Sequence, residues 1–123
     1  MDIEKCFVCG SPNIEVHHIC YRSQVPYMKD AKINLVGLCP LHHRDGKKGV
    51  HFNKKLDLQL KQELQLQLTL LFTKEYYEEE EISQLLGINK KQVARLVKTI
   101  VRQKEGYPNT LIVKRCLGDR FYE

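Results

Sequence analysis

The chain contains 123 residues, of which 42% are hydrophobic and 28% are charged, as is usual for a globular protein. Its longest mostly apolar window, from Leu64 to Phe72, is interrupted by Gln and Thr and is far shorter than a membrane span. The chain begins with polar and acidic residues, so we expect no secretory signal. These features exclude a membrane protein, a disordered tail and a secreted disulfide scaffold.

Charge is unevenly distributed along the sequence. There are 20 Lys and Arg residues against 15 Asp and Glu residues, a formal net charge of +5. An acidic run within residues 75–81 precedes a stretch, residues 90–104, in which every charged side chain is basic. Basic stretches favour polyanionic partners. Charge runs are also common on solvated helix faces, so charge alone does not assign a function.

The first part of the chain predicts short strands at residues 14–19 and 33–39, with a loop at residues 21–32 between them. Pro40 is suited to the first turn of a helix that carries His42 and His43.

Residues 54–72 fit two patterns. Alternating leucines from Leu64 to Leu70 are typical of a strand. A second leucine stripe has helical spacing and consists of Leu56, Leu60, Leu64, Leu68 and Leu71. Length and composition favour a helix of roughly four or five turns.

Beyond the acidic run we expect a helix over residues 80–86, a turn at residues 87–89, and a second helix from Lys90 to about Gln103, with Asn89 as its cap. Residues 110–116 and 120–123 predict a terminal strand pair around a turn at residues 117–119.

Cysteine and histidine are concentrated near one end, because four of the five Cys and all five His lie within residues 1–51. An odd cysteine count favours a reducing compartment, where thiols bind metals. Cys6 and Cys9 form a CxxC pair, which alone also fits redox chemistry or chance. Cys39 and His42 repeat that spacing, and two such pairs can surround a structural Zn²⁺ with three thiolates and one nitrogen.

A second centre follows from helix geometry. Neighbouring helical residues point about 100° apart, so His43 faces away from the zinc ligand His42. We expect its partner to be His17 or His18, at the end of the preceding strand.

The order of these residues resembles the HNH endonucleases of the ββα-metal fold over roughly residues 3–52. The matching elements are Cys6-x-x-Cys9, Val16-His17-His18-Ile19, Asn34-Leu35-Val36-Gly37-Leu38-Cys39 and His42-His43. The run His-His-Arg-Asp-Gly-Lys-Lys-Gly-Val-His, residues 42–51, is similar to small phage-type HNH nucleases associated with recombination.

The resemblance implies that His18 is the general base and that Asn34 orients it. It also implies that His17 and His43 hold a catalytic divalent ion. Many family members have Asp where this chain has His17, and Cys where it has His42. The expected ion is Mg²⁺ or Mn²⁺, with Zn²⁺ or Ni²⁺ as alternatives because imidazole ligands suit them.

Three nearby residues have open interpretations. His51 is a third ligand, a phosphate contact or a loop histidine, whereas Lys47 and Lys48 contact phosphates or are solvated. Cys20 and Cys116 lack metal-ligand spacing and are interpreted as core residues.

Residues 82–96 resemble a helix-turn-helix, with Gly87 in the turn and Lys90 opening the recognition helix. The expected terminal strand pair would form a wing, and the acidic run would lie away from DNA. The predicted DNA-binding side chains of this part are Lys90, Lys91, Arg95, Lys98 and Arg102.

We therefore expect an α+β protein with a zinc-stapled ββα-metal nuclease domain at residues 1–54 and a connecting helix plus helix-turn-helix module at residues 55–123. The expected function is metal-dependent DNA hydrolysis in phage recombination or processing, with DNA and recombination proteins as partners. The expected location is the cytoplasm, that of the host cell if the protein is phage-encoded. The alternative is a zinc-stapled DNA-binding regulator whose HNH unit is catalytically silent.

Overall fold

The computed structural model describes residues 1–123 and confirms the α+β class, with five α-helices and two small antiparallel sheets. The elements are β1 (Glu15–His18), η1 (Pro26–Met28), η2 (Lys32–Asn34), β2 (Leu35–Leu38), α1 (Pro40–Arg44), η3 (Val50–Phe52), α2 (Lys54–Leu71), β3 (Tyr76–Tyr77), α3 (Glu79–Leu86), α4 (Lys90–Val97), β4 (Tyr107–Pro108) and α5 (Asn109–Cys116), where η denotes a 3₁₀ helix. No helix combines the length and apolar character needed to cross a membrane.

Strands β1 and β2 pair antiparallel, with His17 opposite Val36 and His18 opposite Leu35. The segment before β1 lies against this pair, since the Phe7 amide donates a hydrogen bond to the Gly37 carbonyl at 2.9 Å. A Cβ atom at Gly37 would stand 2.9 Å from the Lys5 carbonyl oxygen, so the close approach of the two segments requires glycine. This packing places the N-terminal thiols beside the start of α1.

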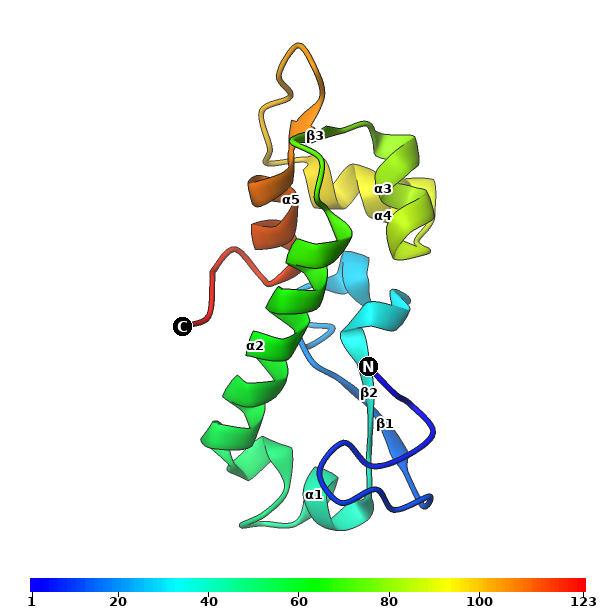
Figure 1. Cartoon of the computed structure of the whole chain (residues 1–123), viewed down its shortest axis with the longest axis vertical. Coiled ribbons are helices and arrows are strands. Elements are labelled where there is room, and N and C mark those ends of the chain that lie inside the picture. Colours follow the sequence, from blue (N-terminus) through cyan, green and yellow to red (C-terminus); the bar gives the residue numbers. More distant parts are fainter.

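Helix α2 confirms the helical interpretation of residues 54–72. Its first turn is capped by Asn53, whose side chain accepts a hydrogen bond from the Leu56 amide at 3.1 Å. The side chains of Leu60, Leu64 and Leu68 are completely buried, as the helical stripe predicts. Figure 1 shows α2 running along the length of the molecule, beside the N-terminal part at one end and α5 at the other.

Helices α3 and α4 are joined by the turn expected from the sequence, in which Gly87 adopts a positive φ of 68°. Asn89 and Gln92 cap α4 reciprocally, each side chain accepting a backbone amide at 2.9 Å. The prediction that this helix continues to Gln103 is wrong, because α4 ends at Val97. Beyond it Val101 is 75% exposed, and the Arg115 guanidinium donates to the carbonyls of the last helical turn.

The predicted strand at residues 110–116 is also wrong, since these residues belong to helix α5. Ile112, Val113 and Cys116 have helical spacing and are buried, so tertiary packing overrides the β-propensity of this segment. Residues 120–123 form no strand. The antiparallel pair near this end is instead β3 with β4, where Tyr77 lies opposite Tyr107.

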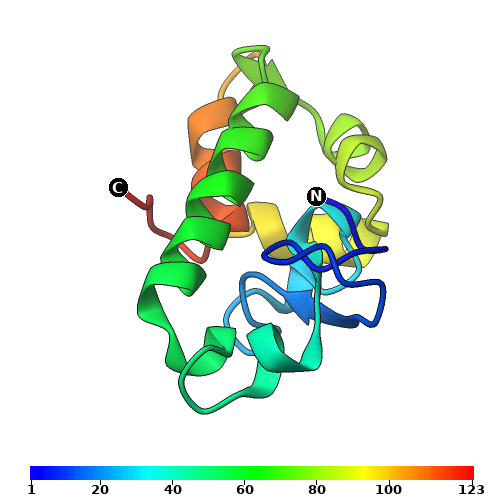
Figure 2. The ribbon, with the colours of Figure 1, turned by 60° about the horizontal axis from the view of Figure 1, so that its bottom comes forward.

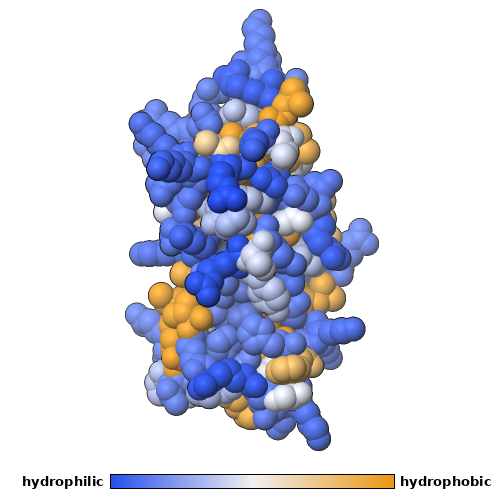
Figure 3. All heavy atoms as spheres, turned by 180° about the vertical axis from the view of Figure 1, so that it is seen from behind, coloured by the Kyte–Doolittle hydropathy of each residue, from blue (hydrophilic) through white to orange (hydrophobic).

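One hydrophobic core of 28 buried residues contains side chains from both predicted domains. Two long-range hydrogen bonds also join them: the Tyr27 hydroxyl donates to the Arg115 carbonyl at 2.7 Å, and Gln92 donates to Asp30 at 2.7 Å. Helix α4 packs against η1 and α2 against η2, both within the segment that connects β1 and β2; Figure 2 shows the ribbon from a second side. Figure 3 shows a predominantly hydrophilic surface on one face of the molecule, with hydrophobic side chains in separate patches.

Candidate functional site

Cys6, Cys9, Cys39 and His42 form a compact cluster that can hold a metal such as zinc. The Cys9 and Cys39 sulfurs are 3.7 Å apart, and His42 Nδ1 lies 3.7 Å from the Cys6 sulfur and 3.2 Å from the Cys39 sulfur. Zinc bond lengths of about 2.3 Å to sulfur and 2.0–2.1 Å to nitrogen give tetrahedral edges of roughly 3.5–3.8 Å. The donor set and its spacing therefore fit zinc.

Local backbone structure explains why the two pairs converge. After Cys6 the chain turns through Gly10, whose φ is 76°, and the Gly10 amide donates back to the Cys6 carbonyl at 2.9 Å. Cys39 immediately precedes α1, which carries His42 in its first turns. Burial alone would raise the pKa of Cys6, but nearby backbone amides outweigh it and lower this pKa to about 6. The thiolate that a metal requires is therefore favoured.

His17, His43 and His51 form a second cluster, in which one nitrogen from each ring lies within 4.8 Å of the others. The three ring centroids are mutually 5.2 Å apart, a nearly equilateral arrangement. The rings come from β1, α1 and η3, so the cluster depends on the packing of three separate elements. This places His51 with the two predicted ligands of the second centre.

His17 provides the strongest indication that the cluster binds a ligand. Its side chain is 3% exposed, and its Nε2 atom is buried without a hydrogen-bond partner. Burial and the neighbouring His43, His51 and His18 lower the pKa of His17 to about 3, so the ring is neutral at physiological pH. A neutral imidazole has one ring nitrogen whose lone pair can bind a metal ion, and no protein group occupies the Nε2 atom of His17.

Glu15 orients His43, a contribution that the sequence analysis missed. The Nδ1 atom of His43 lies 2.8 Å from a Glu15 carboxylate oxygen, and the Arg44 guanidinium contacts the other oxygen at 2.7 Å. The His43 hydrogen bond lowers the pKa of Glu15, with Arg44 acting in the same direction. Because the carboxylate accepts, Nδ1 carries the proton and Nε2 is left free for a metal. The only sequence feature that pointed to Glu15 was the alternation of side chains along β1, which puts Glu15 and His17 on one face.

His18 lies beside the cluster and is held by the loop after η1. Its Nε2 atom is 2.9 Å from the Lys29 carbonyl oxygen. A carbonyl can only accept, so Nε2 carries the proton and Nδ1 remains a free base in the neutral ring. The structure therefore fixes one tautomer of the residue expected to be the general base.

Asn34 is completely buried and holds this loop in place. Its side chain accepts from the Cys20 amide at 2.9 Å and donates to the Cys20 carbonyl at 3.0 Å and to the Met28 carbonyl at 3.4 Å. Asn34 makes no direct hydrogen bond to His18. These hydrogen bonds fix the backbone at Cys20, two residues after His18, and at Met28, directly before Lys29.

An open pocket of about 540 Å³ joins His18 to the histidine cluster. Its lining also includes Tyr21, Arg22 and Ser23, none of which the sequence analysis selected. The Tyr21 ring lies 5.8 Å from that of His51 and 6.2 Å from that of His17. Arg22 is exposed and has no carboxylate partner, so it adds a free positive charge at this pocket. Their position directly after β1 was the only available signal.

The predicted phosphate contacts Lys47 and Lys48 lie outside this pocket. Both are exposed, and their backbone amides donate to the Asp45 carboxylate at 3.0 and 2.9 Å. Lys48 instead lines a hollow beside the zinc-ligand candidate His42.

Helix α4 presents Lys90, Lys91, Arg95 and Lys98 to solvent, with no carboxylate partner for any of them. Arg102 differs, because its guanidinium pairs with Glu78 at 2.5 Å.

The acidic run is close to one edge of α4. Glu79 and Glu80 line a hollow between α3 and α4 together with Lys90. The acidic residues thus neighbour the first turn of the helix expected to contact DNA.

Comparison of the chain with protein-family models, curated proteins and solved structures gave no match.

Proposed function

We propose that this protein is a metal-dependent DNA endonuclease that hydrolyses phosphodiester bonds with His18 as general base. The observation that carries the proposal is the arrangement of one tautomerically fixed histidine beside three clustered histidines in a single open pocket. The order of residues that resembles the HNH endonucleases supports the same assignment.

The geometry supports a role for each residue of the pocket. The free Nδ1 atom of His18 would accept a proton from the attacking water, as a neutral histidine near physiological pH can do. Lys29 and Asn34 would keep that ring and its loop in the productive orientation.

His17, His43 and His51 would hold the catalytic ion, with Glu15 fixing the His43 tautomer. A divalent cation bound there supplies Lewis-acid stabilisation of charge on the phosphoryl and departing oxygens. A set of three imidazoles suits Zn²⁺, Ni²⁺ or Mn²⁺ better than Mg²⁺, which prefers oxygen ligands. The Cys₃His cluster would hold a structural zinc that fixes α1 and therefore His43.

DNA would be bound by the helix-turn-helix formed by α3 and α4. This proposal is supported by the basic face of α4, whose side chains have no carboxylate partner: Lys90, Lys91, Arg95 and Lys98. Arg102 would contribute only after leaving Glu78. We further propose a role in recombination or DNA processing, with recombination proteins as partners, on the resemblance of residues 42–51 to phage-type nucleases.

Plasmid cleavage tests the proposal. Purified protein is incubated with supercoiled, branched and single-stranded DNA in Mg²⁺, Mn²⁺ or Ni²⁺, and in a chelator. We expect cleavage with at least one ion and none in the chelator. DNA binding without cleavage under every ionic condition would contradict the nuclease and favour a DNA-binding regulator.

A further inference from the structure

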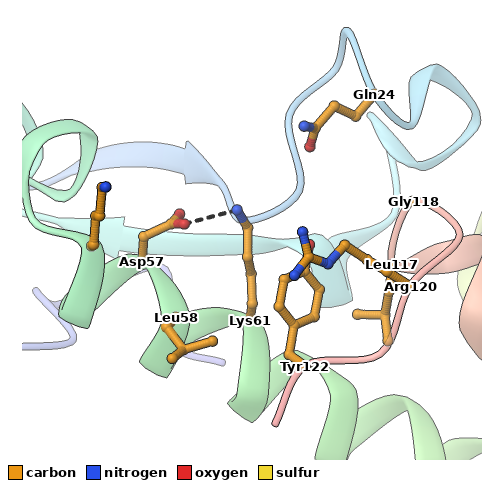
Figure 4. A pocket seen from close by; sticks show the side chains of 9 residues that line it. Gln24, Asp57, Leu58, Lys61, Leu117, Gly118, Arg120 and Tyr122 are labelled. Carbon is orange, nitrogen blue, oxygen red and sulfur yellow. Dashed lines mark hydrogen bonds and ion pairs between the residues drawn. The ribbon is translucent and has the colours of Figure 1, made fainter.

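A second pocket, separate from the histidine pocket, lies between α2 and the C-terminal segment and has a volume of about 400 Å³. Figure 4 shows side chains from three parts of the chain around it: Lys61 from α2, Arg120 and Tyr122 from the C-terminal segment, and Gln24 from the loop after β1. Lys54 and Asp57 complete its charged lining.

The charges of this pocket favour an anion. Lys61 is neutralised by Asp57, whose Oδ2 atom lies 2.8 Å from the ammonium nitrogen, and the other carboxylate oxygen is buried without a hydrogen-bond partner. Lys54 and Arg120 line the same space without any carboxylate partner. Two uncompensated cations and the amide of Gln24 are groups that recognise a phosphate.

The pocket is built on an ordered framework. Gln65 of α2 exchanges two hydrogen bonds with the Tyr122 backbone, accepting from its amide at 2.6 Å and donating to its carbonyl at 3.0 Å. The centroid of the Tyr122 ring lies 4.8 Å from the Arg120 guanidinium carbon and 5.6 Å from the Lys61 nitrogen, so the ring contacts these two cations. Arg120 is therefore directed into the pocket by the attachment of the C-terminal segment to α2.

The two pockets are separate hollows, but consecutive residues of the chain line them. Arg22 and Ser23 line the histidine pocket, and the next residue, Gln24, lines this one. Tyr21 lies near both pockets, because its ring centroid is 5.8 Å from the His51 ring of one pocket and 5.3 Å from the Lys61 nitrogen of the other.

We propose that the pocket lined by Lys54, Lys61 and Arg120 binds a backbone phosphate of the DNA strand whose neighbouring phosphodiester lies at the histidine pocket. This inference rests on the proposed nuclease function and deepens it. The subsite sets which phosphodiester of a bound strand reaches His18.

The test measures DNA binding rather than cleavage, so its result does not depend on whether the protein is catalytically active. In a His18→Ala background, the double variant Lys54→Gln/Arg120→Gln is compared with Lys104→Gln/Lys114→Gln, which removes the same charge from exposed positions outside the pocket. Fluorescence anisotropy gives the affinity for a short oligonucleotide across a salt series, and thermal unfolding checks that each variant is folded. Inorganic phosphate is titrated separately, with NMR of the Arg120 and Gln24 side-chain signals as readout.

We expect the pocket variant to lose roughly tenfold more affinity than the control and its salt slope to fall by about one, because the binding site of one phosphate is lost. Equal affinities and slopes in the two double variants would overturn the proposal. If inorganic phosphate shifts the pocket signals while the oligonucleotide affinities remain equal, the pocket serves a free phosphate and the strand assignment is wrong. A protein that never cleaves DNA but shows the selective loss would refute the nuclease and retain the subsite.

Discussion

Gln92 of α4 donates a hydrogen bond to the Asp30 carboxylate at 2.7 Å, across 62 positions of sequence. Asp30 directly follows Lys29, whose carbonyl accepts from His18. The Gln92 side chain is 8% exposed, and its oxygen is already used to cap α4. The proposed DNA-binding helix is thus attached to the loop that orients the proposed general base.

Replacing Gln92 by Ala should destabilise the protein by about 0.5–2 kcal/mol, because it removes the capping contact with the Asn89 amide and the hydrogen bond to Asp30. The loop at Lys29 should loosen, so that DNA cleavage slows more than DNA binding weakens. Chemical denaturation and single-turnover cleavage measure the two effects. The control is Gln84→Ala on the exposed surface of α3, and identical behaviour of the two variants would contradict the attachment.

Removal of a zinc ligand should unfold the N-terminal part. Cys6→Ser and Cys39→Ser should lose bound zinc, because a structural site of this kind contributes about 10–16 kcal/mol to folding. Cys116→Ala changes a buried cysteine outside the cluster and should retain the metal. Metal analysis and far-UV circular dichroism provide the measurements, and a folded Cys39→Ser protein without zinc would refute the structural role.

The neighbouring residues His42 and His43 should behave differently on replacement by Ala. His42→Ala should lose zinc and stability, since its Nδ1 atom faces the cysteine sulfurs. His43→Ala should keep zinc and fold but lose cleavage, with partial recovery in excess metal. Zinc content, thermal unfolding and cleavage rate separate the two outcomes. The same loss of zinc in both variants would argue against two separate centres.

Alkaline pH should destabilise the protein through Tyr27. Burial raises the pKa of Tyr27 to about 12, whereas an unfolded tyrosine ionises near pH 10. The unfolded state therefore releases its proton first, so this contribution is complete below about pH 10 and is lost as the pH rises toward 12. The free energy of unfolding should fall by at most about 1.4 kcal/mol per pH unit in this window.

Tyr27→Phe is the matched variant for this prediction. It should lose about 1 kcal/mol at neutral pH, with the hydrogen bond to the Arg115 carbonyl, and show a shallower alkaline decline. Parallel alkaline curves for the two proteins would show that Tyr27 is not the source.

DNA affinity should depend on the basic face of α4. Changing Lys91, Arg95 and Lys98 to Gln should weaken binding regardless of DNA sequence and reduce the salt slope by about one per phosphate contact. The fold should persist because these side chains are exposed. Arg102→Gln should have a smaller effect, since Glu78 already pairs with that guanidinium. Unchanged salt dependence of the triple variant would assign α4 a purely structural role.

Sequence periodicity and ligand spacing predicted much of this structure. The leucine stripe identified α2, and the repeated spacing of Cys6–Cys9 and Cys39–His42 identified four residues that do converge. Local patterns failed at α5, where β-branched residues are helical because α5 packs against α2 and α4. Local patterns also could not predict contacts between residues far apart in the sequence, such as Glu15 with His43 and Gln65 with Tyr122.

We propose His18 as the general base, and single-turnover cleavage by His18→Ala measures what this side chain contributes to hydrolysis. We predict a folded protein with unchanged zinc content and DNA affinity that cleaves about 10²–10⁴-fold more slowly than its parent, as expected for loss of a positioned base. Cleavage by His18→Ala at the parental rate in both Mg²⁺ and Mn²⁺ would contradict the assignment.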